Sequence, residues 1–159
     1  MKKLCVIGLG NPLRQDDGIG IVLLEKLVEY KKNLPQSIQY IDGGTGGMNI
    51  LHLFAQFDIV FIIDAAFFNA HPGCGKLFTS QQIKDSRISF YHTTHEFDIL
   101  KIINLSKSLD ELPERIFFFG VQPKDTSIGT ELSKELKQNV EKLFKKLVIE
   151  LKKVYEELM

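Results

Sequence analysis

IVFII, at residues 59–63, is an uninterrupted run of large and mostly β-branched apolar residues. Consecutive apolar side chains without polar alternation are typical of a strand that is buried on both faces, as in the parallel sheet of an α/β protein. Asp64 follows the run directly. The sequence therefore predicts a carboxylate at the carboxyl end of a central strand.

Two strands and two helices are predicted before this run. Short apolar segments at residues 4–7 (LCVI) and 38–41 (IQYI) each end in a glycine-rich turn, which is typical of strands that stop abruptly. Between them, apolar residues recur at helical spacing over residues 19–31. Residues 48–57 form a short predicted helix, so strands and helices alternate up to the central run.

The pattern changes after the central run. Only residues 65–75 separate it from the next predicted strand, 76–79, and a parallel return usually needs a crossover of about a dozen residues or more. This strand is therefore predicted to be antiparallel and to lie at an edge. The remaining predicted elements are a helix at 96–106, a strongly apolar strand at 115–121 and a long helix at 132–158.

This order of elements predicts an α/β fold built as a three-layer sandwich. We expect a twisted, mostly parallel sheet of five strands with one antiparallel edge strand and with helices on both faces. Right-handed crossovers place the second and third strands on opposite sides of the first. No repeat, low-complexity tract or linker interrupts the sequence, so we expect a single domain over residues 1–159.

Composition excludes several classes of partner. Twenty basic residues balance twenty acidic ones, which argues against nucleic acid or an anionic membrane surface as a partner. No apolar run approaches the ~20 residues of a membrane span, and residues 1–3 lead into a strand without a signal-peptide cleavage pattern. Two cysteines, Cys5 and Cys74, do not make a disulfide framework. We expect a cytoplasmic protein that is a monomer and does not insert into membranes.

Three residues are predicted at strand ends or helix starts: Asp17, Asp64 and His95. In a doubly wound sheet, ligands bind beyond the carboxyl ends of the strands, where the winding reverses. Asp17 and Asp64 follow strands that should be neighbours, ~4.8 Å apart, and the loop with His95 returns to the same edge. Two carboxylates and an imidazole suit a first-row transition metal and leave coordination positions open. Taken singly, each residue also fits a helix cap or a turn.

Other motifs give weaker signals. Residues 8–13 (GLGNPL) imitate a dinucleotide-binding loop, but a leucine stands in the place of the third glycine. A nucleophile pair of Cys74 and His71 is conceivable, although both lie in a Pro/Gly loop that would not hold a base rigidly. His92 precedes His95 by three residues and is an alternative metal ligand.

These motifs resemble, as a set, those of the hydrogenase maturation proteases. Members of this family are endopeptidases that trim the C-terminal extension from the large subunit of nickel–iron hydrogenases. The resemblance extends from residue 4 to about 123, in the family's order and spacing, and its last two motifs look most like the formate-hydrogenlyase branch. The motifs are GLGNPLRQDDGIG at 8–20, DGGT at 42–45, IDA at 63–65, PG at 72–73, TTH at 93–95 and FGVQP at 119–123.

The resemblance implies roles for individual residues. Asp17, Asp64 and His95 match the family's metal-binding and catalytic positions, the first of which is Glu or Asp in the family. The metal is implied to be nickel that is already installed in the hydrogenase large-subunit precursor, so it is supplied by the substrate and is not expected to be tightly bound in the isolated enzyme. Nickel would polarise the scissile carbonyl or activate water. Asp16 is the candidate base for the water route, and Asp42 is expected to support docking or the geometry of the site.

The implied function is that of a metal-dependent, aspartic-type endopeptidase. Two alternatives stay open: a non-catalytic nickel-binding assembly factor, and a metal hydrolase with its own bound zinc. A nucleotide-binding module ranks last because its glycine motif is broken. Glu96, directly after the histidine, adds a negative charge for which the sequence suggests no role.

Overall fold

The computed structural model describes residues 1–85, 88 and 99–159. Its centre is a sheet with the strand order β2-β1-β3-β5-β4. β1 pairs in parallel with β2 and β3, β3 pairs in parallel with β5, and β4 pairs antiparallel with β5. The strands are β1 (Leu4–Gly8), β2 (Gln39–Asp42), β3 (Ile59–Ala65), β4 (Gly75–Thr79) and β5 (Arg115–Val121).

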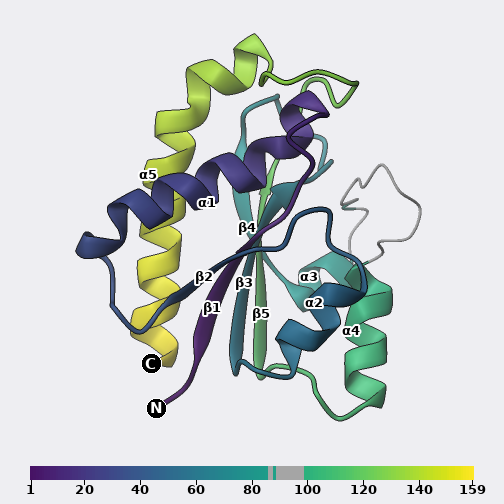
Figure 1. The fold of residues 1–159 in the computed structure, drawn as a ribbon, viewed down its shortest axis with the longest axis vertical. Helices are drawn as coiled ribbons and strands as arrows, with labels where there is room; N and C mark the ends of the chain where they lie inside the picture. Colours follow the sequence, from purple (N-terminus) through teal and green to yellow (C-terminus); the bar gives the residue numbers. More distant parts are fainter. Residues whose placement is uncertain (86–87, 89–98) are drawn as a thin grey trace.

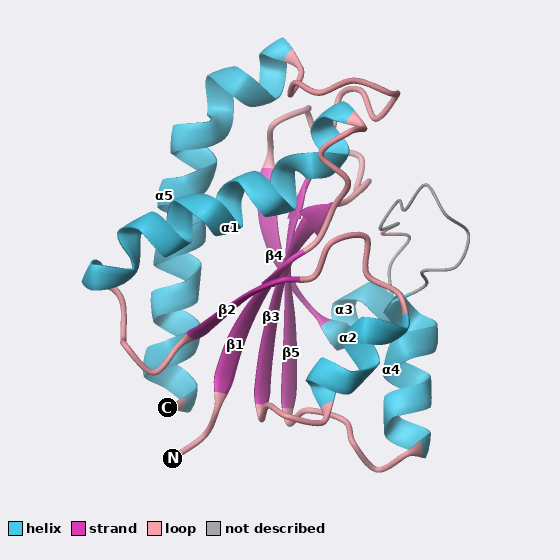
Figure 2. Ribbon diagram, in the orientation of Figure 1, coloured by secondary structure: helices cyan, strands magenta, loops and turns pink. Residues whose placement is uncertain are grey.

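Helices cover both faces of the sheet (Figures 1 and 2). One face is covered by α1 (Ile19–Tyr30) and α5 (Lys134–Leu158), and the other by α2 (Met48–Phe54), α3 (Ser80–Asp85) and α4 (Ile99–Ser108). Two short 3-10 helices, η1 (Gln15–Gly18) and η2 (Lys31–Asn33), flank α1. The predicted three-layer α/β fold with one antiparallel edge strand is confirmed.

β3 explains why the central run is apolar at every position. All of its side chains are buried, and successive residues alternate between the two cores. Phe61 and Ile63 pack under α1 and α5, whereas Val60 and Ile62 pack under the helices of the opposite face. Burying each of these large side chains contributes roughly 2 kcal/mol, so both faces of β3 favour apolar residues over polar ones.

Helix boundaries differ from the sequence predictions at several points. α3 was not predicted, because a helix this short with one buried residue, Ile83, leaves no periodic pattern. α5 begins at Lys134 because Ser133 is its N-cap, with the side-chain oxygen accepting a hydrogen bond from the Leu136 N–H at 3.3 Å. α2 ends at Phe54. The predicted start of α4, residues 96–98, lies outside the described residues.

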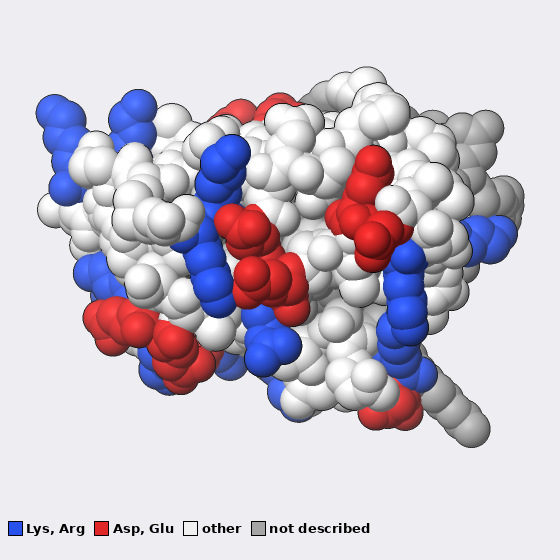
Figure 3. Space-filling view, turned by 90° about the horizontal axis from the view of Figure 1, so that it is seen from below, with Lys and Arg blue, Asp and Glu red and all other residues white. Residues whose placement is uncertain are grey.

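The ends of the chain lie together at the amino-terminal edge of the parallel strands (Figure 1). Viewed from this side, the surface carries acidic and basic side chains next to one another, without a large patch of one sign (Figure 3). Within the described residues, no helix combines the length and the apolar character that a membrane crossing requires.

Candidate functional site

Asp17 lies in the loop that connects β1 to α1, and its side chain is buried. Its Oδ2 accepts a hydrogen bond from the backbone N–H of Asn11 at 3.0 Å, and its own N–H donates to the Arg14 carbonyl at 3.1 Å. Gly10 lies so close to the backbone of Asp17 that a Cβ at position 10 would collide with the Asp17 carbonyl oxygen. The loop therefore closes on itself and fixes the position of the Asp17 carboxylate.

Asp64 is fully buried near the carboxyl end of β3. The backbone N–H of Ala65 donates to its Oδ1 at 2.8 Å. In the sheet, Asp64 pairs in register with Gly120 of β5, on the side of β3 opposite to β1. A central strand that is paired on both sides holds this carboxylate in place.

The two carboxylates belong to backbone segments that are packed against each other. Leu9, just after β1, donates its N–H to the carbonyl of Ile63 at 2.9 Å. Gly20 fits against the carbonyl oxygens of both Leu9 and Ile63, where any side chain would collide with them. The loop that carries Asp17 is thus fixed to the residue that precedes Asp64. The structure places both carboxylates at the same edge of the sheet.

The predicted third ligand, His95, lies outside the described residues, as do His92 and Glu96. In the part of the chain that is described, no group of three or more His, Cys, Asp or Glu side chains is arranged to hold a metal ion. Asp17 and Asp64 supply hard oxygen donors, which suit a divalent metal when further ligands complete the shell. The metal-binding triad stays a prediction.

Asp16 joins the site loop to a distant segment. Its Oδ2 accepts hydrogen bonds from the backbone N–H groups of Lys124 at 2.8 Å and Asp125 at 3.0 Å, and its Oδ1 accepts one from Ser133 at 2.7 Å. Its own N–H donates to the Asp125 carbonyl at 3.0 Å. Since both carboxylate oxygens already accept backbone hydrogen bonds, this geometry favours a positioning role over that of a general base.

Further contacts join the same two segments. The guanidinium of Arg14 donates from Nε to the Thr126 carbonyl at 3.2 Å, and Gln15 donates its backbone N–H to the Gly129 carbonyl at 3.0 Å. Gln15 has a φ of 47°, which is uncommon for a residue with a side chain. The loop between β5 and α5 therefore fixes the position of η1 through these hydrogen bonds. Sequence reasoning missed this support.

Asp16→Asn is expected to lower the free energy of unfolding by about 3 kcal/mol, because an amide donor then faces backbone donors in a buried place. Chemical denaturation measures this loss. Asp125→Asn is the matched control, since the Asp125 carboxylate is exposed and bonds locally to Ser127. Unchanged stability of Asp16→Asn together with lost turnover would instead support the general-base role.

Asp42 ends β2 and is exposed to solvent. Its Oδ1 accepts a hydrogen bond from the Gly44 N–H at 2.8 Å, so it shapes the turn after the strand. This turn is tied to the loop after β1, because Gly43 donates to the Gly8 carbonyl at 2.9 Å and Gly10 donates to the Gly44 carbonyl at 2.8 Å. Its role in docking stays a prediction.

Gln122 organises the loop that follows Asp64 and β3. It is 8% exposed, and its Oε1 accepts hydrogen bonds from the N–H groups of Phe68 at 2.9 Å and Ala70 at 3.4 Å. Its backbone N–H also donates to the Cys74 carbonyl at 2.9 Å. The glutamine was noted only as part of a motif. Its position directly after an apolar strand is the feature of the sequence that could have indicated a structural role.

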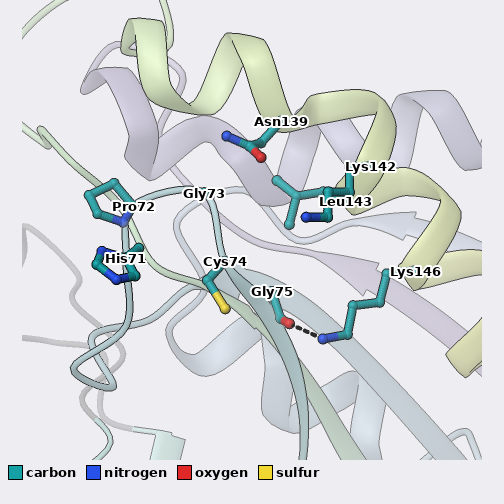
Figure 4. A pocket seen from close by; sticks show the side chains of 9 residues that line it. All are labelled: His71, Pro72, Gly73, Cys74, Gly75, Asn139, Lys142, Leu143 and Lys146. Carbon is teal, nitrogen blue, oxygen red and sulfur yellow. Dashed lines mark hydrogen bonds between the residues drawn. The ribbon is translucent and has the colours of Figure 1, made fainter.

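The alternative pair of Cys74 and His71 lies elsewhere, in a pocket of about 280 Å³ between the β3–β4 loop and α5. Figure 4 shows that the Cys74 sulfur does not point toward the His71 ring. Lys146 closes one side of this pocket by donating to the Gly75 carbonyl at 2.6 Å. The arrangement does not support a nucleophile–base pair. At Cys5, burial raises the pKa of the thiol to about 12, which makes it unreactive.

The fold and the site define a doubly wound α/β protein with two buried carboxylates at the carboxyl edge of adjacent parallel strands. Residues 21–150 match the family model described as hydrogenase maturation protease, HycI. Because this match covers most of the sequence, the chain belongs to the hydrogenase maturation protease family.

Individual relatives agree with this assignment. The chain is 24% identical to the hydrogenase expression/formation protein HupD of Thiocapsa roseopersicina, over 87% of this chain and 62% of that protein. It is 30% identical to the coenzyme F420 hydrogenase subunit delta of Methanothermobacter thermautotrophicus, over 79% and 77% of the two chains. The chain thus spans less than two thirds of the length of the HupD relative.

Among solved structures, the hydrogenase maturating endopeptidase HybD from E. coli has a similar fold. The TM-score is 0.77 at 23% sequence identity, and the similarity covers 96% of this chain and 93% of HybD. At this identity the similarity concerns the fold.

Proposed function

We propose that the protein is an endopeptidase that removes the C-terminal extension of a nickel–iron hydrogenase large-subunit precursor after nickel insertion. The observation that carries the proposal is the position of two buried carboxylates, Asp17 and Asp64, on segments that are packed together at the carboxyl edge of the sheet. Membership of the maturation protease family supports the same reaction class.

In this proposal the nickel ion is part of the substrate. When the precursor docks, Asp17, Asp64 and His95 supply two oxygens and one nitrogen to the ion, a donor set that suits a first-row divalent metal. A precursor without nickel offers these side chains nothing to bind. The enzyme therefore recognises whether its substrate has been loaded.

The chemistry follows from charge stabilisation at a buried site. A divalent ion polarises the scissile carbonyl or lowers the pKa of a bound water, and either effect lowers the barrier to amide hydrolysis. Asp17 and Asp64 are almost fully shielded from solvent, so the attraction between their carboxylates and a bound cation is little screened by water. Their fixed positions avoid the cost of reorganising during the reaction.

Nickel-free precursor is expected to resist cleavage even with excess enzyme. The measurement is mass spectrometry of the cognate precursor after incubation, with and without prior nickel loading, following release of the extension peptide. Efficient trimming of the nickel-free form would contradict recognition through substrate-borne nickel. Stable complex formation with loaded precursor but no peptide release would instead identify an assembly factor.

The alternative with a resident zinc ion is decided by a separate measurement. A permanent site would retain metal near stoichiometrically through purification, whereas the proposal predicts that the isolated protein carries little metal. Metal analysis of the purified protein by mass spectrometry distinguishes the two.

A further inference from the structure

β2 is an edge strand whose outer side pairs with no other described strand. Among the described residues only β1 pairs with it, and in Figure 1 it is the outermost strand beside α1. Gly43, directly after β2, donates its N–H to Gly8 of β1. Because successive residues of a strand direct their backbone groups to opposite sides, Tyr40 and Asp42 direct theirs away from β1. An added strand would find hydrogen-bonding groups there.

A groove of about 440 Å³ runs beside this open edge. We call it the α1–β2 groove; it is lined by Ile21, Leu24, Glu25, Val28 and Glu29 of α1 and by Tyr40 and Asp42 of β2. Its floor is apolar. Val28, which also lines the groove, is 39% exposed.

The rim of the α1–β2 groove is acidic. Glu25 and Glu29 are exposed on α1, Asp42 is exposed on β2, and no salt bridge within the described part of the chain neutralises them. Lys26, the cation beside them on α1, is paired with Glu141 at 2.7 Å. Burial raises the pKa of Tyr40, so its hydroxyl stays neutral. The groove therefore carries negative charge and favours a basic occupant.

Backbone contacts connect the end of β2, which lines the α1–β2 groove, to the loop of the candidate site. The turn after β2 is tied to the loop after β1 through the hydrogen bond from Gly10 to Gly44 at 2.8 Å. Gly10 in turn packs against the backbone of Asp17. The end of β2 is thus joined to the loop that carries Asp17 through two successive backbone contacts.

We propose that the α1–β2 groove binds an extended segment that adds to the sheet as a strand beside β2 and directs basic and apolar side chains, at every second position, toward α1. Main-chain hydrogen bonds to the free edge give affinity, and the apolar floor and acidic rim select the side chains. The bound segment is the part of the hydrogenase precursor that adjoins the cleaved bond. This identification of the segment rests on the proposed function.

The binding step is tested by fluorescence anisotropy with a dye-labelled peptide about eight residues long. Lysine and valine alternate at its odd positions and threonine fills its even positions, so that both kinds of side chain face α1. The Glu25→Gln/Glu29→Gln double variant is expected to bind it about fivefold more weakly than the wild type, since two exposed charge pairs are lost. The Glu156→Gln/Glu157→Gln double variant is the control, because it removes the same charge from the exposed end of α5. The same peptide with glutamate in place of each lysine is expected not to bind.

Val28→Lys tests the apolar floor. A lysine at this exposed helical position should block the groove and repel the basic peptide, whereas Ile149→Lys makes the same change at a residue of α5 that is 53% exposed. Equal affinity of the two variants, or no binding of the basic peptide by the wild type, overturns the proposal. If the protein forms a dimer that is lost in the Val28→Lys variant and kept in the Ile149→Lys variant, the groove binds a second copy of the chain. This outcome also overturns the proposal.

The link to the substrate is tested separately with nickel-loaded precursor. Both groove variants are expected to raise KM about fivefold and to leave kcat unchanged, because the groove binds the segment without touching the reacting bond. An unchanged KM overturns this part of the inference. If the wild type cleaves no precursor at all, the proposed function fails, and the peptide titrations still decide whether the groove binds basic segments.

Discussion

Asp64→Asn is expected to abolish processing of the nickel-loaded precursor and to leave the protein folded. The amide keeps the shape of the side chain but removes the charge and one oxygen donor from a fully buried position. Altering only a second-shell partner of a metal ligand costs about 10–100-fold, so loss of a donor itself should slow cleavage by more than about a hundredfold. Cleavage is measured as release of the extension peptide by mass spectrometry.

The same loss is expected for Asp17→Asn and for His95→Gln, since each removes one predicted donor. Asp110→Asn is the control, because Asp110 is exposed and its φ of 59° is well tolerated by asparagine. The melting temperatures of Asp17→Asn and Asp64→Asn should change by less than about 3 °C, because the asparagine Oδ1 can accept the backbone hydrogen bond that each carboxylate accepts from Asn11 or Ala65. A variant that processes the precursor at the wild-type rate would remove its residue from the mechanism.

Gly20→Ala is expected to lower the free energy of unfolding by more than about 3 kcal/mol, because the new methyl group collides with rigid backbone. The atoms in its way are the carbonyl oxygens of Leu9 and Ile63. To avoid this collision, α1 must move away from β1 and β3. The same movement separates the loop that carries Asp17 from Asp64. Calorimetry should show a melting temperature lower by about 10 °C, and processing should fall in the same variant.

Gly44→Ala provides the comparison for this loss. Gly44 has a φ of 54°, but a Cβ there meets nothing within 4 Å, so the substitution carries only the backbone strain of about 1 kcal/mol. If both variants lose the same stability, the close contact of Gly20 with the strand ends has no special cost. In that case η1 and α1 are not held against β3 in the way described.

The sequence was sufficient for most of the fold because its strands are short and strongly apolar. The central run alternates between two cores, which requires apolar residues at every position and makes the strand easy to recognise. The length of the β3–β4 connection was enough to predict an antiparallel edge strand. α3 escaped prediction because one buried residue, Ile83, leaves no period to detect.

The candidate site was predicted in part. Strand order alone brought Asp17 and Asp64 to one edge of the sheet, because the ends of neighbouring parallel strands are adjacent whatever their separation in sequence. The placement of His95 and the identity of the metal remain predictions. Asp16 was proposed as a base, and its hydrogen bonds favour a structural role.

By itself, the sequence determined the α/β class, the relative order of the first three strands, the antiparallel edge strand and the residues that end the strands, because hydrophobic periodicity and turn chemistry are local properties of the chain. The tertiary structure decided what holds the site together and what lies next to it. Asp16 finds its partners 108 to 117 residues away, and the α1–β2 groove exists only where a helix and an edge strand meet. Such contacts depend on how elements pack in space, which no local pattern records.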